Sequence, residues 1–151
     1  MQNYKDYYNS KLLSANEFQD FVAVEFAKIG ISVTNFSSKL YQIKKGENLQ
    51  GFEIKHDEMF RKTGNIWIEK QERFSPEKEY VNSGIFRSDN TKFYVIGDYE
   101  GVFLMQKKIL QHMALKYKEI ENTRRTSIGF LLPVEDAKKY FDYIQFTSDK
   151  P

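Results

Sequence analysis

Charged side chains are frequent in residues 51–73, GFEIKHDEMFRKTGNIWIEKQER, and Glu53, Lys55 and Asp57 fall at every second position. The stretch divides into two runs with the two-residue period of β-strands, residues 50–60 and 66–73. Because residues 62–65 include a glycine and two other turn formers, we expect them to join the two strands as a hairpin. One face of this hairpin would carry three acids, a lysine and an amide, namely Glu53, Asp57, Glu69, Lys55 and Gln71.

Two interpretations of this charged face remain open. Three neighbouring carboxylates repel one another, and a divalent cation held by two of them removes the repulsion. The same residues would also form an ordinary solvent-exposed sheet face with Lys–Glu pairs across the strands, each worth less than ~1 kcal/mol.

A fourth acid, Glu25, lies in a predicted helix upstream of the hairpin. It falls seven residues after Phe18 and four before Ile29, in the middle of the helix's apolar stripe. A buried carboxylate needs a metal, a lysine or hydrogen-bond donors, because burying it alone costs several kcal/mol. Alternatively, the stripe ends early and Glu25 reaches solvent past Val22.

The remaining elements must position these residues. A capping box at Ser14 predicts the start of the first helix, and Gly30 predicts its end near residue 29. Further along, the pattern predicts an extended stretch at 31–43, strands at 92–96 and 102–105, a helix at 107–120, a strand at 128–132, a helix at 134–141 and a strand at 143–146. We therefore expect one α/β domain over residues 1–151, with a central mixed β-sheet flanked by helices.

Composition limits both the compartment and the chemistry. The chain has no run of 18 apolar residues, and its first residues lack the apolar core of a signal peptide, so we expect a cytoplasmic protein with no membrane partner. It has no cysteine and two histidines, so a bound metal would be held by oxygen, which favours Mg²⁺, Mn²⁺ or Ca²⁺. The net charge of +2 does not by itself indicate nucleic acid, although basic doublets recur along the chain.

The order of these residues resembles the PD-(D/E)xK nuclease superfamily, which has the restriction-endonuclease-like fold. That family has a helix with an acid, followed by a hairpin with an acid on its first strand and a (D/E)xK triplet on its second. Glu25, Asp57 and Glu69 match these three acids, and the resemblance covers roughly residues 14–105. The segments around Gly46-Glu47-Asn48 and Thr63-Gly64-Asn65 also resemble small phage and prophage proteins placed in this superfamily.

The triplet departs from the family pattern, because Gln71 stands where the lysine is expected. Lys55, on the first strand, would have to replace it. A second registration takes Glu53-Ile54-Lys55 as the ExK triplet, and the upstream acid is then Glu47, in a loop. The first registration is preferred here because it supplies the strand, turn and strand that the family has.

The resemblance implies a metal-dependent deoxyribonuclease. Asp57, Glu69 and the backbone carbonyl of Lys70 would bind Mg²⁺ or Mn²⁺, and Glu25 would hold a metal-bound water or a second ion. Lys55 would orient the water or the phosphate, and Gln71 would hydrogen-bond the water or a ligand carboxylate. DNA backbone contacts are expected from five basic residues: Lys44, Lys45, Lys62, Arg73 and Arg87. Such nucleases are commonly homodimers. The alternative is a non-catalytic member of the fold that binds nucleic acid or a protein.

Overall fold

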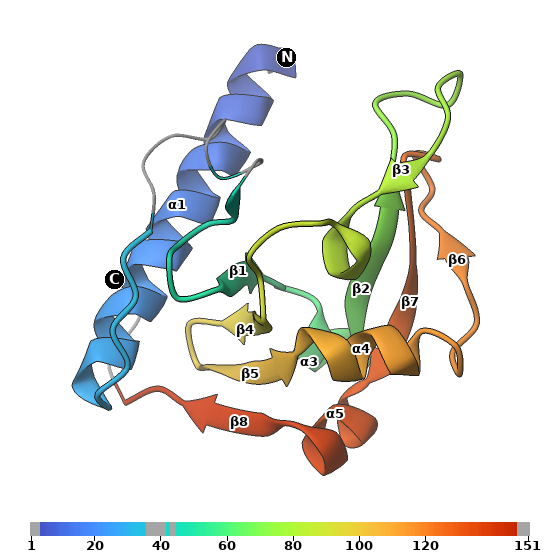
Figure 1. The fold of residues 1–151 in the computed structure, drawn as a ribbon. Helices are drawn as coiled ribbons and strands as arrows, with labels where there is room; N and C mark the ends of the chain where they lie inside the picture. The colour runs from blue at the N-terminus through green and yellow to red at the C-terminus, as the bar shows by residue number, and fades with distance from the viewer. Residues whose placement is uncertain (1–3, 36–41, 43–44, 148–151) are drawn as a thin grey trace.

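The structure is a computed structural model that describes residues 4–35, 42 and 45–147 (Figure 1). Its helical elements are α1 (Tyr4–Lys28), α3 (Phe60–Thr63), the 3₁₀ turn η1 (Gly84–Phe86), α4 (Lys107–Met113) and α5 (Val134–Tyr140). Within this part of the chain, no helix combines the length and the apolar character that a membrane span requires.

The strands form two four-stranded sheets. The first is mixed, in the order β1-β4-β5-β8, with β1 parallel to β4 and the other neighbours antiparallel. The second is antiparallel, in the order β3-β2-β7-β6. The strand bounds are β1 Phe52–His56, β2 Asn65–Glu72, β3 Val81–Asn82, β4 Phe93–Asp98, β5 Gly101–Gln106, β6 Ile120–Glu121, β7 Ser127–Pro133 and β8 Asp142–Gln145. The expected mixed sheet flanked by helices is confirmed.

The expected hairpin of residues 50–73 is wrong, because its two strands belong to different sheets: β1 pairs with β4, and β2 pairs with β3 and β7. The cause is local. Asp57 Oδ1 accepts the backbone N–H groups of Met59 (2.9 Å) and Phe60 (3.0 Å), which starts the short helix α3. Phe60 is buried, and Gly64 ends the helix with φ +75°. The chain therefore leaves one sheet and enters the other where a simple turn was expected.

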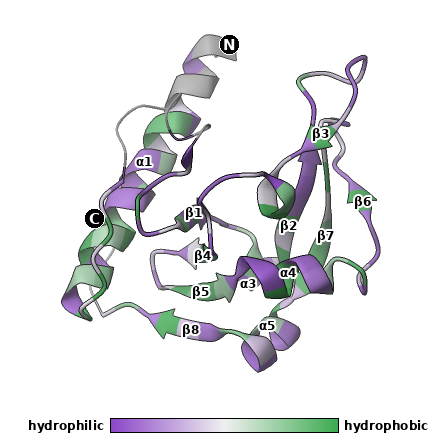
Figure 2. Cartoon of the chain, in the orientation of Figure 1, coloured by the Kyte–Doolittle hydropathy of each residue, from purple (hydrophilic) through white to green (hydrophobic). Residues whose placement is uncertain are grey.

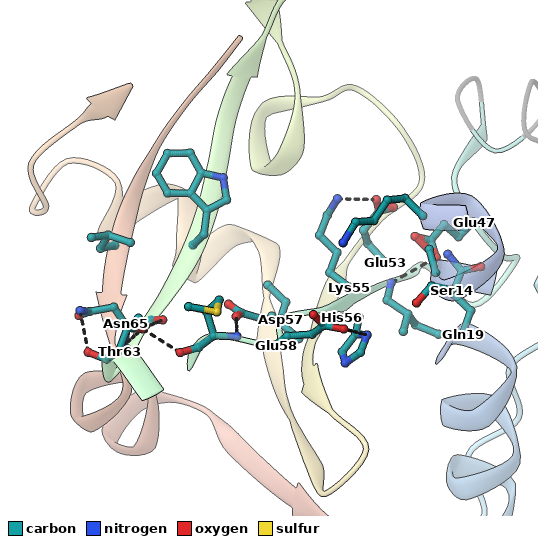
Figure 3. Close-up of a pocket in the computed structure, with 17 residues that line it drawn as sticks. Ser14, Gln19, Glu47, Glu53, Lys55, His56, Asp57, Glu58, Thr63 and Asn65 are labelled. Carbon is teal, nitrogen blue, oxygen red and sulfur yellow. Dashed lines mark hydrogen bonds and ion pairs between the residues drawn. The ribbon is translucent and has the colours of Figure 1, made fainter. Parts of the chain in front are cut away.

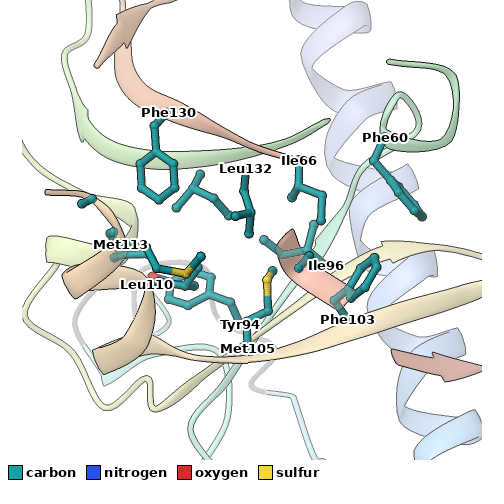
Figure 4. Close-up of a cluster of buried hydrophobic side chains, with 14 residues drawn as sticks. Phe60, Ile66, Tyr94, Ile96, Phe103, Met105, Leu110, Met113, Phe130 and Leu132 are labelled. Atoms are coloured by element: carbon teal, nitrogen blue, oxygen red, sulfur yellow. The ribbon is translucent and has the colours of Figure 1, made fainter. Parts of the chain in front are cut away.

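The mixed sheet lies between two apolar clusters. On one face it packs against α1, through Phe18, Val22 and Phe26 of the helix and Ile54, Val95 and Val102 of the strands. On its other face Tyr94, Ile96, Phe103 and Met105 meet the second sheet and α4 (Figure 4). The alternation along β4 and β5 is the period of two that their sequences predict. Hydrophobic colour accordingly dominates β5 and β7 in Figure 2.

The remaining predicted elements differ from the structure mainly at their ends. Helix α1 begins at Tyr4, ten residues before the capping box, because residues 4–13 contain no Gly or Pro and continue the helix. It ends as predicted, and Gly30 has φ +85°. Helix α4 stops at Met113, short of residue 120. The β4–β5 hairpin, β7, α5 and β8 fall within one or two residues of their predicted positions. The expected extended stretch at 31–43 lies partly outside the described residues, and its visible end is a single bridge from Asn35 to Asn48.

Candidate functional site

A large cavity, of about 870 Å³, lies where α1, β1, α3 and the outer ends of β2 and β7 meet. Figure 3 shows Ser14, Gln19, Glu47 and Glu53 grouped toward α1, and Asp57, Thr63 and Asn65 on the side of the second sheet. Lys55 lies between the two groups. The cavity therefore has a charged part, built on β1, and a second part built on β2 and β7.

A tight turn brings Glu47 beside β1. Asn48 bonds to the backbone of Phe52 twice: its Oδ1 accepts the N–H (2.8 Å) and its Nδ2 donates to the carbonyl (2.7 Å). Gly51 completes the reversal with φ +78°, where a Cβ would lie 2.8 Å from the Asn90 carbonyl oxygen. Glu47 Oε2 then accepts the N–H of Ile54 at 3.3 Å. The carboxylate of Glu47 is thus fixed against the free edge of β1, and the residue is 7% exposed.

Lys55 projects from β1 among three carboxylates. Its Nζ lies 3.5 Å from Glu53 Oε1. Desolvation of the ammonium acts to lower its pKa, but the negative charges of Glu53, Glu69 and Glu47 outweigh this, so the pKa of Lys55 lies above its ordinary value of 10.5. At neutral pH this side chain is therefore a fixed positive charge in the middle of the cavity.

Glu25 is buried, as the phase of the helix predicted. It is 5% exposed, and its Oε1 lies 2.9 Å from Lys28 Nζ, one turn further along α1. A lysine, one of the three partners considered for this residue, is therefore present. The residues of α1 that line the large cavity come from earlier turns: Lys11, Ser14, Ala15 and Gln19.

Asp57 lines the cavity but has a structural task. Its Oδ1 accepts the two backbone N–H groups that begin α3, so that oxygen is already engaged. This explains an acid at the end of β1 without a ligand, because aspartate is a favoured residue for capping a helical turn.

The carboxylate of Glu69 accepts hydrogen bonds from two serine hydroxyls. Ser83 Oγ donates to Glu69 Oε2 (3.1 Å), and Ser127 Oγ donates to Glu69 Oε1 (2.8 Å). The residue lines a second cavity of about 70 Å³, which it shares with Lys55. The negative charge of Glu69, like that of Glu53, raises the pKa of Lys55.

The rest of the second triplet points elsewhere. A register shift between Glu69 and Gln71 interrupts the pairing of β2 with β7. Lys70 Nζ lies 2.7 Å from Glu119 Oε1, and Gln71 Nε2 lies 3.5 Å from Asn82 Oδ1. In residues 4–35, 42 and 45–147, no three acidic or histidine side chains are arranged to hold a metal ion. The structure thus does not bring Glu25, Asp57 and Glu69 together, because β1 and β2 are in separate sheets.

The structure describes four of the five basic residues expected to contact DNA. Lys44 lies outside the described residues, and Lys45 and Lys62 are exposed. Arg73 stacks over Tyr80, with 4.1 Å from its guanidinium carbon to the ring centre, and donates to the Arg125 carbonyl. Arg87 lies 2.8 Å from Glu72. The two arginines are therefore engaged within the protein.

Sequence reasoning missed Gln19, which is 8% exposed and lines the charged part of the cavity. The signal was present, since Ala15, Gln19 and Val22 follow the i, i+4, i+7 spacing of one helix face. An amide within that apolar face points to a polar neighbour, and here the neighbouring part of the cavity contains Glu47 and Glu53.

Comparisons of the chain with protein-family models, with curated proteins and with solved structures found no match. The site must therefore be interpreted from its own chemistry. The charged part of the cavity contains two carboxylates, one amide and one ammonium group. Glu47 and Glu53 supply the hard oxygen ligands that Mg²⁺ and Mn²⁺ prefer, and Mg²⁺ is often bound through only one or two carboxylates, with water and phosphate as its other ligands. The residues present fit such an ion.

Proposed function

We propose that this chain is a metal-dependent nuclease that hydrolyses DNA phosphodiester bonds. Its catalytic centre would consist of Glu47, Glu53 and Lys55. The observation that carries the proposal is the placement of Glu47 against β1, beside the triplet Glu53-Ile54-Lys55, at one cavity. An acid, a chain reversal and a strand with an ExK triplet follow one another in the order that the PD-(D/E)xK resemblance implies. The structure thus favours the second registration of that motif over the first.

Each residue has a role that its surroundings support. Glu47 and Glu53 would hold Mg²⁺ or Mn²⁺, which would neutralise charge on the phosphate and make a water more acidic. Lys55, kept protonated by its acidic neighbours, would orient the scissile phosphate and stabilise the charge that develops on it. Gln19 would hydrogen-bond a water or a ligand carboxylate from α1.

A second candidate is a non-catalytic domain that binds nucleic acid or a protein. Two observations favour it: Lys55 already pairs with Glu53, and the three-acid metal group is absent from the described part of the chain. An ammonium neutralised in this way would anchor a ligand without assisting a reaction.

Cleavage assays separate the two candidates. Single-stranded and duplex DNA would be incubated with the protein in Mg²⁺, in Mn²⁺ and in EDTA. We expect cleavage in either metal, loss of cleavage in EDTA, and loss of cleavage in Glu53→Gln. Glu58→Gln is the matched control, because Glu58 lines the same cavity with its side chain 65% exposed. Equal activity in wild type and Glu53→Gln would contradict the proposed centre, and binding without cleavage in both metals would favour the second candidate.

A further inference from the structure

The part of the cavity built on the second sheet is apolar and open. Met59 is 53% exposed and Leu131 is 40% exposed, and both line the cavity together with the half-buried Trp67. Apolar side chains on a shared concave surface are unfavourable in water and mark binding sites more often than isolated exposed residues do. Met59, Trp67 and Leu131 together form this surface, the tryptophan wall.

The indole of Trp67 has a defined seat on the sheet. Trp67 lies opposite Leu131 in the antiparallel register of β2 and β7, and Gly129 lies two residues before Leu131 on β7, on the same face. A Cβ at Gly129 would come within 2.9 Å of Trp67 Cζ2. The absence of a side chain there lets the benzene half of the indole lie across β7. The ring is therefore supported by backbone while it lines the cavity.

Polar groups border the tryptophan wall. Thr63 and Asn65 lie at the end of α3, where the Thr63 hydroxyl donates to the Met59 carbonyl (3.0 Å) and accepts the N–H of Asn65 (3.2 Å). These bonds fix the backbone that carries the Asn65 side chain to the cavity. An amide at the edge of an aromatic surface can bond to the edge of a flat heterocycle stacked on that surface.

The cavity is continuous, so one ligand can contact both of its parts. A nucleotide has the same division: an anionic phosphate and a flat, largely apolar base. With the phosphate at Lys55, the neighbouring base would lie toward the tryptophan wall. A base inside a duplex is already stacked on both sides and cannot occupy this position, whereas an unpaired base can.

We infer that the tryptophan wall is a nucleobase subsite, in which Trp67 stacks on an unpaired base of the DNA strand whose phosphate lies at Lys55. This inference rests on the proposed function and makes it more specific. The substrate would be a single strand, a flap or a frayed end rather than an intact duplex.

The chain offers a direct probe, because Trp67 is its only tryptophan. Wild-type protein in EDTA, where no cleavage is expected, would be titrated with a 5′-labelled single-stranded oligonucleotide. We expect saturable quenching of tryptophan fluorescence that follows the anisotropy of the label. An oligonucleotide of the same length with abasic sites, and the corresponding duplex, should each bind roughly tenfold more weakly and quench less.

Variants test whether stacking causes these effects. Trp67→Ala should weaken single-strand binding by roughly tenfold, and Trp67→Phe should retain most of it because a smaller ring still stacks. Phe74→Ala is the matched control, since Phe74 is an aromatic residue 91% exposed on the loop after β2. Thermal unfolding of each variant would show that the fold is intact.

The outcomes distinguish this inference from the proposed function. If cleavage requires Glu53 but Trp67→Ala binds and cleaves single strands as wild type does, the subsite is wrong and the nuclease stands. Equal affinity for intact, abasic and duplex DNA also overturns the subsite. If the protein neither binds nor cleaves any of these DNAs, both proposals fail.

Discussion

Strands β1 and β2 each carry a triplet with the same spacing, Glu53-Ile54-Lys55 and Glu69-Lys70-Gln71. On β1 the acid and the lysine both line the large cavity, with Glu47 beside them. On β2 both oxygens of the acid accept hydroxyl hydrogens, and a bulge turns the rest of the triplet away. A short motif therefore acquires its chemistry from the segments beside the strand, and similar residue types alone do not distinguish a reactive carboxylate from a structural one.

The largest expected effect is on cleavage, and only substitution in the β1 triplet should produce it. Glu53→Gln should lower kcat/KM by about 100-fold or more, which is a loss of about 2.7 kcal/mol of transition-state stabilisation. Glu69→Gln should lower it by less than roughly tenfold, because Glu69 acts only through the charge of Lys55. Initial rates on a fluorescent single strand would measure both. A greater loss in Glu69→Gln would restore the first registration of the motif.

For the free energy of unfolding we expect the opposite order, with a larger loss on substitution of Glu69 than on substitution of Glu53. Glu69→Ala removes the acceptor of two serines, and Ser83 and Ser127 are 0% and 8% exposed. We expect the free energy of unfolding to fall by about 2–3 kcal/mol, because buried hydroxyls lose their partners. Glu53→Ala should cost less than about 1 kcal/mol, since its partner Lys55 is partly exposed. Urea unfolding of the two variants would measure the difference, and equal losses would contradict the structural role of Glu69.

A smaller effect concerns the ionisation of Lys55. The acids raise its pKa above 10.5, so the charged cluster favours the folded state below that pH and loses this contribution as the pH rises through the folded-state pKa. The stability difference between wild type and Glu53→Gln should therefore narrow above about pH 10.5. NMR titration of the lysine side chains should show a lower Lys55 pKa in Glu53→Gln than in Glu69→Gln. The reverse order would mean that Lys55 is coupled mainly to the second sheet.

The smallest expected effect comes from Gln71→Lys, which would create a (D/E)xK triplet on β2. Gln71 lies beyond the bulge and near Asn82, so a lysine there should not raise the cleavage rate. Nor should it rescue Lys55→Ala. Cleavage by the Lys55→Ala, Gln71→Lys double variant at the wild-type rate would show that the β2 triplet reaches the site.

The sequence predicted strands and faces better than it predicted neighbours. Alternation placed Ile54 in the core and Glu53 and Lys55 away from it, and the structure agrees. Alternation does not specify a strand's partner, however, so two strands close in sequence were expected to pair. The error followed from Asp57, which resembles a metal ligand in the sequence but accepts the Met59 and Phe60 N–H groups in the turn that leads into α3.

Part of the candidate site can be predicted from the sequence. The sequence allows both registrations of the motif, and Glu47 is the less favourable acid there because it lies in a predicted loop. The hydrogen bonds between the Asn48 side chain and the Phe52 backbone place that loop, and with it Glu47, against β1. Side-chain bonds of this kind leave no periodic signal in a sequence. Burial of Glu25 could be predicted from helix phase, but the choice of Lys28 as a partner could not.

The order of the strands also bears on how the chain folds. Along the sequence, β1 belongs to the mixed sheet, β2 and β3 to the antiparallel sheet, and β4 and β5 to the mixed sheet again. Strands β6 and β7 then complete the antiparallel sheet, and β8 completes the mixed sheet. Asn65 on β2 pairs with Pro133 on β7, so β2 is synthesised long before its partner. Contacts this distant in sequence slow folding and leave an apolar strand edge exposed on the nascent chain. A cut anywhere between β2 and β7 would therefore leave neither fragment with a complete sheet.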